Sequence, residues 1–218
     1  MPETNSKNTI YTEVRRSIIM GHRKPGERLN VEEIANTYQT SITPVRDALQ
    51  HLGQEGLVTI KPRSGYFVTH ITLKELRDMF ELRNILEFAA LERTVERITE
   101  EQFAALYHVH AGYTGDDDES YDRYTAENQR FHYLLAEASG NQELARTLKH
   151  LLDRLARFMV LRHAGKTLEE THTRILDGLH NQDLTTARQA LSDDIGDTFD
   201  ISLARILENE ASVWHIDW

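Results

Sequence analysis

The sequence predicts a mainly α protein in two parts, a winged helix-turn-helix over residues 1–70 and an all-α helical bundle over residues 71–218. Three observations predict this fold class. The first 70 residues hold three short helical patterns followed by two β-type runs, and the rest of the chain holds only long amphipathic helical patterns. The length of 218 residues suits two modest domains, each able to bury a core of its own.

The first expected helix begins at Asn8 or Thr9 and ends at Met20. Apolar residues recur within it at three- and four-residue spacing, which places one stripe against a core; these are Ile10, Val14, Ile18 and Ile19. Gly21 and the Pro25-Gly26 turn then end the helical pattern.

Two shorter helices are expected next. Asn30 is a suitable N-cap for a helix over residues 31–38. Thr43 is expected to cap the third helix, with Pro44 at the first helical position, where the missing backbone N–H costs nothing. The close succession of the two helices is typical of a helix-turn-helix.

Two β-type runs follow the third helix, at residues 57–60 and 66–69. Between them stand Lys61-Pro62-Arg63-Ser64-Gly65, which predict a hairpin with a basic tip. Three helices followed by a basic hairpin within 70 residues is the layout of a winged helix-turn-helix.

Beyond Ile71 the strand signals stop and amphipathic helical patterns take over. We expect six helices there, at about 72–97, 99–112, 118–138, 141–164, 167–181 and 183–208. The second part is therefore expected to be an all-helical bundle.

Composition excludes several classes of site. The chain has no cysteine, so disulfides, thiolate zinc sites and cysteine nucleophiles are ruled out, and a cytoplasmic location is expected. No signal-peptide pattern is seen at the start, and no apolar run approaches the roughly 18 residues of a membrane span, so no membrane partner is expected.

Charge is divided unequally along the chain. The net charge is -10, but residues 1–70 carry nine Lys or Arg against seven Asp or Glu, a balance of +2. The remaining residues carry 16 against 28, a balance of -12. This asymmetry favours an anionic partner for the first part alone.

Side chains suited to double-stranded DNA lie at the start of the third helix and on the hairpin. A recognition helix enters the major groove by its N-terminal end, where Ser41 and Thr43 suit phosphate and Arg46 suits guanine or phosphate. Lys61 and Arg63 can reach the neighbouring backbone or minor groove. Either feature alone is also explained by a solvated surface, but the two in this order favour a DNA reader.

The same segments resemble the DNA-binding domain of GntR-family regulators. The matching residues are Pro25-Gly26-Glu27-Arg28-Leu29, Ser41 to Leu49, Leu52, Glu55-Gly56-Leu57-Val58 and Gly65-Tyr66-Phe67-Val68. The resemblance adds Arg28 to the expected DNA-binding residues, and it implies a homodimer that reads a palindromic operator. Ile42 stands where the family most often has arginine, so the operator is expected to differ from the family's common one.

The second part resembles the FCD-type effector domain of the FadR subfamily, in its six-helix variety. The matching residues are Phe80-Glu81-Leu82-Arg83 with Glu87, Phe131-His132, Ala136, Gly140-Asn141, His172 with Ile175-Leu176, Asp183 and Ala187.

Helical periodicity separately places polar side chains on inward faces of four expected helices. They are Arg83, Asn128, His132, His172 and Asp194. Buried polar groups need partners, so we expect a shared polar cavity that binds an effector. For Arg83 taken alone, an ion pair with Glu87 one turn further along explains the position equally well.

Many relatives hold a divalent metal in this domain with one Asp and three His. The corresponding positions here are Asn128, His132, His172 and Asp194, so two of the four ligand types differ and the carboxylate stands last rather than first. Two imidazoles and a carboxylate suit zinc, nickel, manganese or iron. The alternative is a metal-free cavity that grips an organic acid directly, and both interpretations stay open at this point.

Two functions follow from these residues. The first is a DNA-binding transcriptional regulator, with repression the favoured mode, whose operator affinity responds to a small carboxylic or sugar acid. The second is a metal-dependent enzyme with a two-His, one-carboxylate site. The second is the weaker hypothesis, because no general base or nucleophile is placed beside the expected ligands and a DNA reader is attached.

Overall fold

The computed structural model describes residues 3–110, 115, 117–160 and 165–209. The chain divides into two compact units at Thr72–Leu73. Within the described residues, no helix combines the length and apolar character that crossing a bilayer requires.

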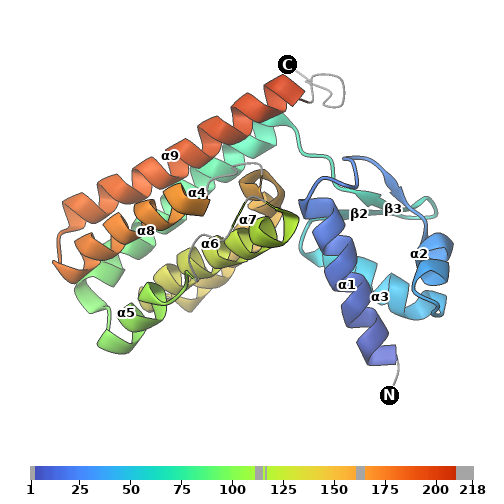
Figure 1. Ribbon diagram of the computed structural model, residues 1–218, viewed down its shortest axis with the longest axis horizontal. Coiled ribbons are helices and arrows are strands. Elements are labelled where there is room, and N and C mark those ends of the chain that lie inside the picture. The colour runs from blue at the N-terminus through green and yellow to red at the C-terminus, as the bar shows by residue number, and fades with distance from the viewer. Residues whose placement is uncertain (1–2, 111–114, 116, 161–164, 210–218) are drawn as a thin grey trace. The chain divides into compact units, whose positions relative to one another are not determined.

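The first unit is a winged helix-turn-helix, as predicted (Figure 1). Its elements are α1 (Glu3–Ile19), β1 (Arg28–Leu29), α2 (Val31–Thr37), α3 (Ile42–Gln54), β2 (Val58–Lys61) and β3 (Gly65–Val68). The three strands form an antiparallel sheet in the order β1-β3-β2. Val58 pairs with Val68 and Lys61 with Gly65, which closes the predicted hairpin at its basic tip.

The core of this unit is formed largely by α1 packing on α3. All four residues of the predicted stripe on α1 are buried, and three of them, Ile10, Val14 and Ile18, share one core cluster with Val45, Leu49 and Leu52 of α3. Burial of large aliphatic side chains stabilises such a small unit by about 1.5–3 kcal/mol each. The apolar spacing seen in the sequence is thus what fixes α3 in place.

Three details of the first unit differ from expectation. Helix α1 begins at Glu3 rather than Asn8, because its added first turns are polar and carry no apolar signal. Thr43 is not the N-cap of α3; Ser41 is, which places Pro44 third in the helix, still among the N–H groups that need no intrahelical partner. Strand β1 was not predicted, since two residues are too short for a periodic pattern.

The second unit is all-helical, as predicted (Figure 1). Its helices are α4 (Leu73–Arg97), α5 (Glu100–Tyr107), α6 (Asp118–Ala138), α7 (Gln142–Val160), α8 (Gly165–His180) and α9 (Leu184–Asn209). Helix α4 packs against α6, α7 and α9, while α8 lies along α9. The central position of α4 lets its inward side chains meet those of several other helices.

Local signals explain several helix ends in this unit. Thr99 and Gln102 form a reciprocal capping box at the start of α5, and Asp117 caps α6 by accepting from the Ser120 backbone N–H. Helix α5 ends at Tyr107 rather than at residue 112. The expected end of α7, at residue 164, lies outside the described residues.

Helices α8 and α9 approach closely at Gly178. A Cβ atom built on Gly178 would lie 2.6 Å from the backbone nitrogen of Ala187, closer than atoms can pack. Only glycine therefore lets α8 and α9 cross at this distance, and these two helices carry His172 and Asp194.

We predict that Gly178→Ala lowers the free energy of unfolding by about 1–3 kcal/mol, because the methyl group forces the helices apart. Gly196→Ala is the matched control on α9, where a Cβ atom meets nothing within 4 Å. That change should leave stability equal or slightly higher, as alanine favours helix. Urea unfolding of both variants checks this, and equal stabilities would contradict the close approach.

Candidate functional site

The N-terminal end of α3 is open to solvent. Ser41, Thr43 and Arg46 are exposed, and the Ser41 side chain forms no capping hydrogen bond with the helix. Ile42 is 38% exposed at the first helical position. The hydroxyls, the guanidinium and the free N–H groups of this end therefore face outward together, which suits an anion.

A surface hollow lies between α3 and the wing, which consists of β2, β3 and the turn between them. Its lining includes Arg28, Arg46, Lys61 and Arg63, so four of the expected DNA-binding residues lie around one depression. The Lys61 ammonium lies 4.9 Å from the centre of the Phe67 ring, which supports its stem on the sheet. The structure thereby gathers on one face the cations that the sequence separates by up to 35 positions.

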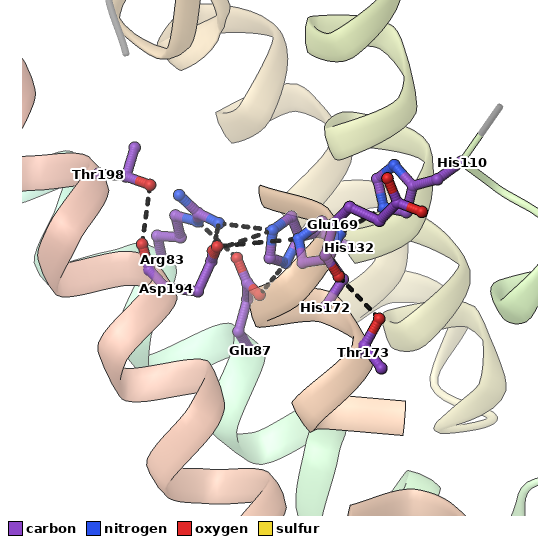
Figure 2. Close-up of polar contacts among 9 residues, drawn as sticks. All are labelled: Arg83, Glu87, His110, His132, Glu169, His172, Thr173, Asp194 and Thr198. Carbon is purple, nitrogen blue, oxygen red and sulfur yellow. Dashed lines mark hydrogen bonds and ion pairs between the residues drawn. The ribbon is translucent and has the colours of Figure 1, made fainter. Parts of the chain in front are cut away.

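The second unit holds a buried cluster of ionisable side chains, drawn in Figure 2. It is built by Arg83 and Glu87 from α4, His132 from α6, His172 from α8 and Asp194 from α9. Each of these side chains is at most 1% exposed. Burying so many charges is costly unless they are paired, so their mutual contacts decide what the cluster can do.

Arg83 is the centre of these contacts. Its Nε donates to Glu87 Oε1 over 2.6 Å, and its Nη2 lies 2.9 Å from His132 Nε2 and 3.3 Å from Asp194 Oδ2. The expected ion pair with Glu87 is present, and the guanidinium also joins α4 to α6 and α9. Its Nη1 is buried and has no hydrogen-bond partner among the described residues.

His132 is held on both sides of its ring. Nδ1 lies 2.6 Å from Glu87 Oε2, and Nε2 lies 3.3 Å from Asp194 Oδ2. Because an ionised carboxylate only accepts, Nδ1 carries the proton; because Arg83 only donates, Nε2 offers it a lone pair. The neutral ring therefore presents a basic nitrogen toward Asp194, whereas a protonated ring would donate its Nε2–H to that carboxylate.

His172 completes the cluster from α8. Its Nε2 lies 3.8 Å from Asp194 Oδ1, and its ring stacks on Phe131 with centroids 3.8 Å apart and planes 10° apart. One turn further along α9, the Thr198 hydroxyl donates to the backbone carbonyl of Asp194. Figure 2 shows these side chains in a row that ends at His110.

The structure brings together four of the five expected effector-binding residues, Arg83, His132, His172 and Asp194. The fifth, Asn128, is buried on α6 one turn before His132. Sequence reasoning missed the part played by Glu87 in holding His132, and it missed His110 and Glu127 altogether. His110 Nε2 lies 2.7 Å from His172 Nδ1, and its Nδ1 lies 3.2 Å from Glu127 Oε2.

The charges of the cluster oppose the effect of burial. Burial alone would raise the pKa of Glu87, but Arg83 and His132 outweigh it and the pKa is lowered. Burial would likewise raise the pKa of Asp194, yet the hydrogen bond and the charge that a protonated His132 supplies hold it well below its usual range. Burial and the Arg83 charge lower the pKa of His132, but the Glu87 carboxylate and the hydrogen bond with Asp194 together reverse this, so the pKa is raised. While His132 is neutral, two carboxylates beside one guanidinium leave an excess of negative charge, which attracts a proton or a further cation.

The geometry fits a small metal ion. The ligand atoms of His132, His172 and Asp194 all lie within 4.8 Å of one another. Two ligands of one zinc ion, each at about 2.0–2.1 Å, lie roughly 3.3 Å apart, and the His132 Nε2 to Asp194 Oδ2 distance is 3.3 Å. Arg83 Nη2 contacts both of these atoms, so an ion bound there would take over the position of that N–H group.

Comparison with known proteins identifies both units. Residues 6–68 match the model of bacterial regulatory proteins of the gntR family, and residues 78–197 match the FCD domain. The HTH-type transcriptional regulator YdhC of Bacillus subtilis is 29% identical over 83% of this chain and 83% of its own length. The HTH-type transcriptional repressor RspR of Escherichia coli is 28% identical over 84% of this chain and 82% of its own. Among solved structures, Escherichia coli McbR/YncC superposes with a TM-score of 0.71 at 21% identity, covering 92% of this chain and 98% of that one.

We predict that Arg83→Met destabilises the metal-free protein at neutral pH by about 3–5 kcal/mol, because two buried carboxylates lose their cation. Arg188→Met is the matched control: Arg188 pairs with Glu92 at the surface, both about half exposed. Loss of that pair should cost about 0–1 kcal/mol. Urea unfolding measures both, and an equal cost for the two variants would contradict a central role for Arg83.

Proposed function

Since this chain belongs to the GntR family of bacterial transcriptional regulators and carries an FCD domain, we propose that it is a repressor whose DNA affinity is set by a small acid bound in its helical unit. The matched families and relatives are transcriptional regulators, so the chain is a regulator and not an enzyme. The observation that carries the proposal is the buried Arg83–His132–Asp194 cluster, a charged site inside a domain that is fused to a DNA reader.

DNA is proposed to bind at the open end of α3 and at the wing. Ser41, Thr43 and Arg28 would contact phosphate, Arg46 a base edge or phosphate, and the wing cations the neighbouring groove. This assignment is supported by the shared hollow that Arg28, Arg46, Lys61 and Arg63 line.

The active form is proposed to be a homodimer on a palindromic operator. Two-fold symmetry would place two copies of α3 in successive turns of the major groove, about 34–36 Å apart. The exposed Ile42 at the start of α3 supports an operator that differs from the family's common one.

The effector is proposed to be a small carboxylic or sugar acid. Arg83 Nη1 supports this, since a buried guanidinium nitrogen without a partner among the described residues is suited to a carboxylate oxygen. An effector that favours one state of the dimer would shift DNA affinity by its differential affinity, typically about 1–3 kcal/mol. The repressive mode is supported by the name of the relative RspR.

A divalent ion is proposed to assist effector binding, held by His132, His172 and Asp194 with the Asn128 carbonyl oxygen as a weaker fourth ligand. Zinc, nickel, manganese and iron all suit this set. When bound, the ion would supply a positive, Lewis-acidic position for the acid's oxygens. The metal-free alternative differs in one respect, that Arg83 alone would grip the acid.

We predict that Arg46→Ala weakens binding to DNA fragments selected by the wild-type full chain by about 1–3 kcal/mol, or roughly 5- to 150-fold. Arg97→Ala, an exposed arginine at the end of α4, is the control and should leave affinity unchanged. Fluorescence anisotropy at two salt concentrations measures both. Failure of the wild type to select any fragment would contradict the DNA-binding proposal.

We predict that the chelator-treated full chain binds zinc, and that Asp194→Asn weakens binding by more than the roughly 10- to 100-fold that loss of an outer partner costs, because it removes the anionic ligand. Asp193→Asn is the control, since Asp193 is the preceding residue and pairs instead with Arg174. Calorimetric titration measures both affinities. If the wild-type protein binds no zinc but does bind a small acid, the result would favour the metal-free alternative.

A further inference from the structure

His110 reaches the buried cluster from outside the set of residues that the proposed function uses. It stands three residues after the end of α5, and its imidazole meets that of His172 at 2.7 Å. Behind it stands Glu127 of α6, which is also within 3.3 Å of Arg123 Nε. Two rings and a carboxylate thus form a line that leads into the cluster.

The hydrogen bonds along this line fix where the protons lie when both rings are neutral. Ionised Glu127 only accepts, so His110 Nδ1 carries its proton and donates it. His110 Nε2 is then a lone pair, which accepts from His172 Nδ1–H. His172 is left with a bare Nε2, the atom that faces Asp194.

A histidine must have an unprotonated nitrogen to bind a metal ion. His132, the other histidine of the cluster, also has an unprotonated Nε2 when its ring is neutral. Glu87 accepts from Nδ1 of His132 and leaves its Nε2 basic. In metal-bound histidines, the N–H of the second ring nitrogen commonly donates a hydrogen bond to a carboxylate, which orients the ring and strengthens the ligand. Glu87 serves His132 directly, whereas Glu127 serves His172 through His110.

Two different neighbours fix the plane of the His172 ring and the position of its proton. Phe131 stacks on it at 3.8 Å and nearly parallel, which fixes the plane but does not distinguish Nδ1 from Nε2. The contact with His110 does distinguish them, because only one ring edge faces it. The contact with His110 therefore favours one orientation of the ring within that plane.

We propose that His110, backed by Glu127, is a positioning residue for the candidate metal centre, which keeps the proton of His172 on Nδ1 and its Nε2 unprotonated, as a metal ligand must be. This inference rests on the proposed metal site. It assigns to His110 no contact with the ion itself.

The test compares three variants of the chelator-treated full chain, titrated with zinc. His110→Phe removes the acceptor and should weaken zinc binding about 10- to 100-fold. His110→Gln keeps a carbonyl acceptor and should retain more affinity than His110→Phe. His108→Phe is the control, since His108 is exposed two residues earlier and should bind zinc as the wild type does.

A second readout reports the proton directly. Nitrogen-15 NMR of the imidazoles in the metal-free full chain should show His172 protonated on Nδ1, and His110→Phe should change that pattern. Protonation of His172 on Nε2 in the wild type would overturn the proposal. So would equal zinc affinities for His110→Phe and His110→Gln.

These outcomes separate this inference from the proposed function. If the wild type binds zinc and His110→Phe binds it equally well, only the role of His110 fails. If the wild type binds no zinc, the metal site fails and this inference fails with it.

Discussion

The Arg83 guanidinium is the one charge on which the helical unit depends. It lies in a region closed to solvent, between the carboxylates of Glu87 and Asp194, and it donates to His132. A buried carboxylate without a cation is strongly destabilising, so α4, α6 and α9 are held at the spacing that this one side chain allows. The folding of the unit and the chemistry of its site therefore share the same contacts.

The same arrangement of charges also favours the binding of a cation at the site. One guanidinium does not balance two carboxylates, and the raised pKa of His132 is the effect of that excess on its nearest base. A further cation would be stabilised by the same field. Because Arg83 Nη2 already contacts His132 and Asp194, the entry of an ion would release that N–H group, and Arg83 would then have two donors for the oxygens of an acid. An acid that binds the ion-bound cluster and the ion-free cluster with different affinities has the differential affinity that regulation requires.

Much of this could be predicted from the sequence, wherever the signal is periodic. The stripe through Ile10, Val14 and Ile18 predicted α1, and inward polar positions predicted Arg83, His132, His172 and Asp194. The signal fails where the determining contact is not periodic. Thr43 was the wrong cap because Ser, Thr and Pro within four residues allow more than one start for α3, and β1 exists only through its pairing with β3. His110 follows the last turn of α5, so no helical periodicity predicts that its side chain lies inward. Its partner His172 is 62 positions away in the sequence.

The central claim is that the cluster accepts a cation in the place where Arg83 Nη2 now lies. Anomalous diffraction at the zinc edge, from crystals of the full chain grown with zinc, tests this most directly. The claim predicts one strong peak at about 2.0–2.2 Å from ligand atoms of His132, His172 and Asp194, with the Arg83 guanidinium turned away from it. A map with no peak there, and with Arg83 still bonded to His132 and Asp194 at full zinc saturation, would contradict it.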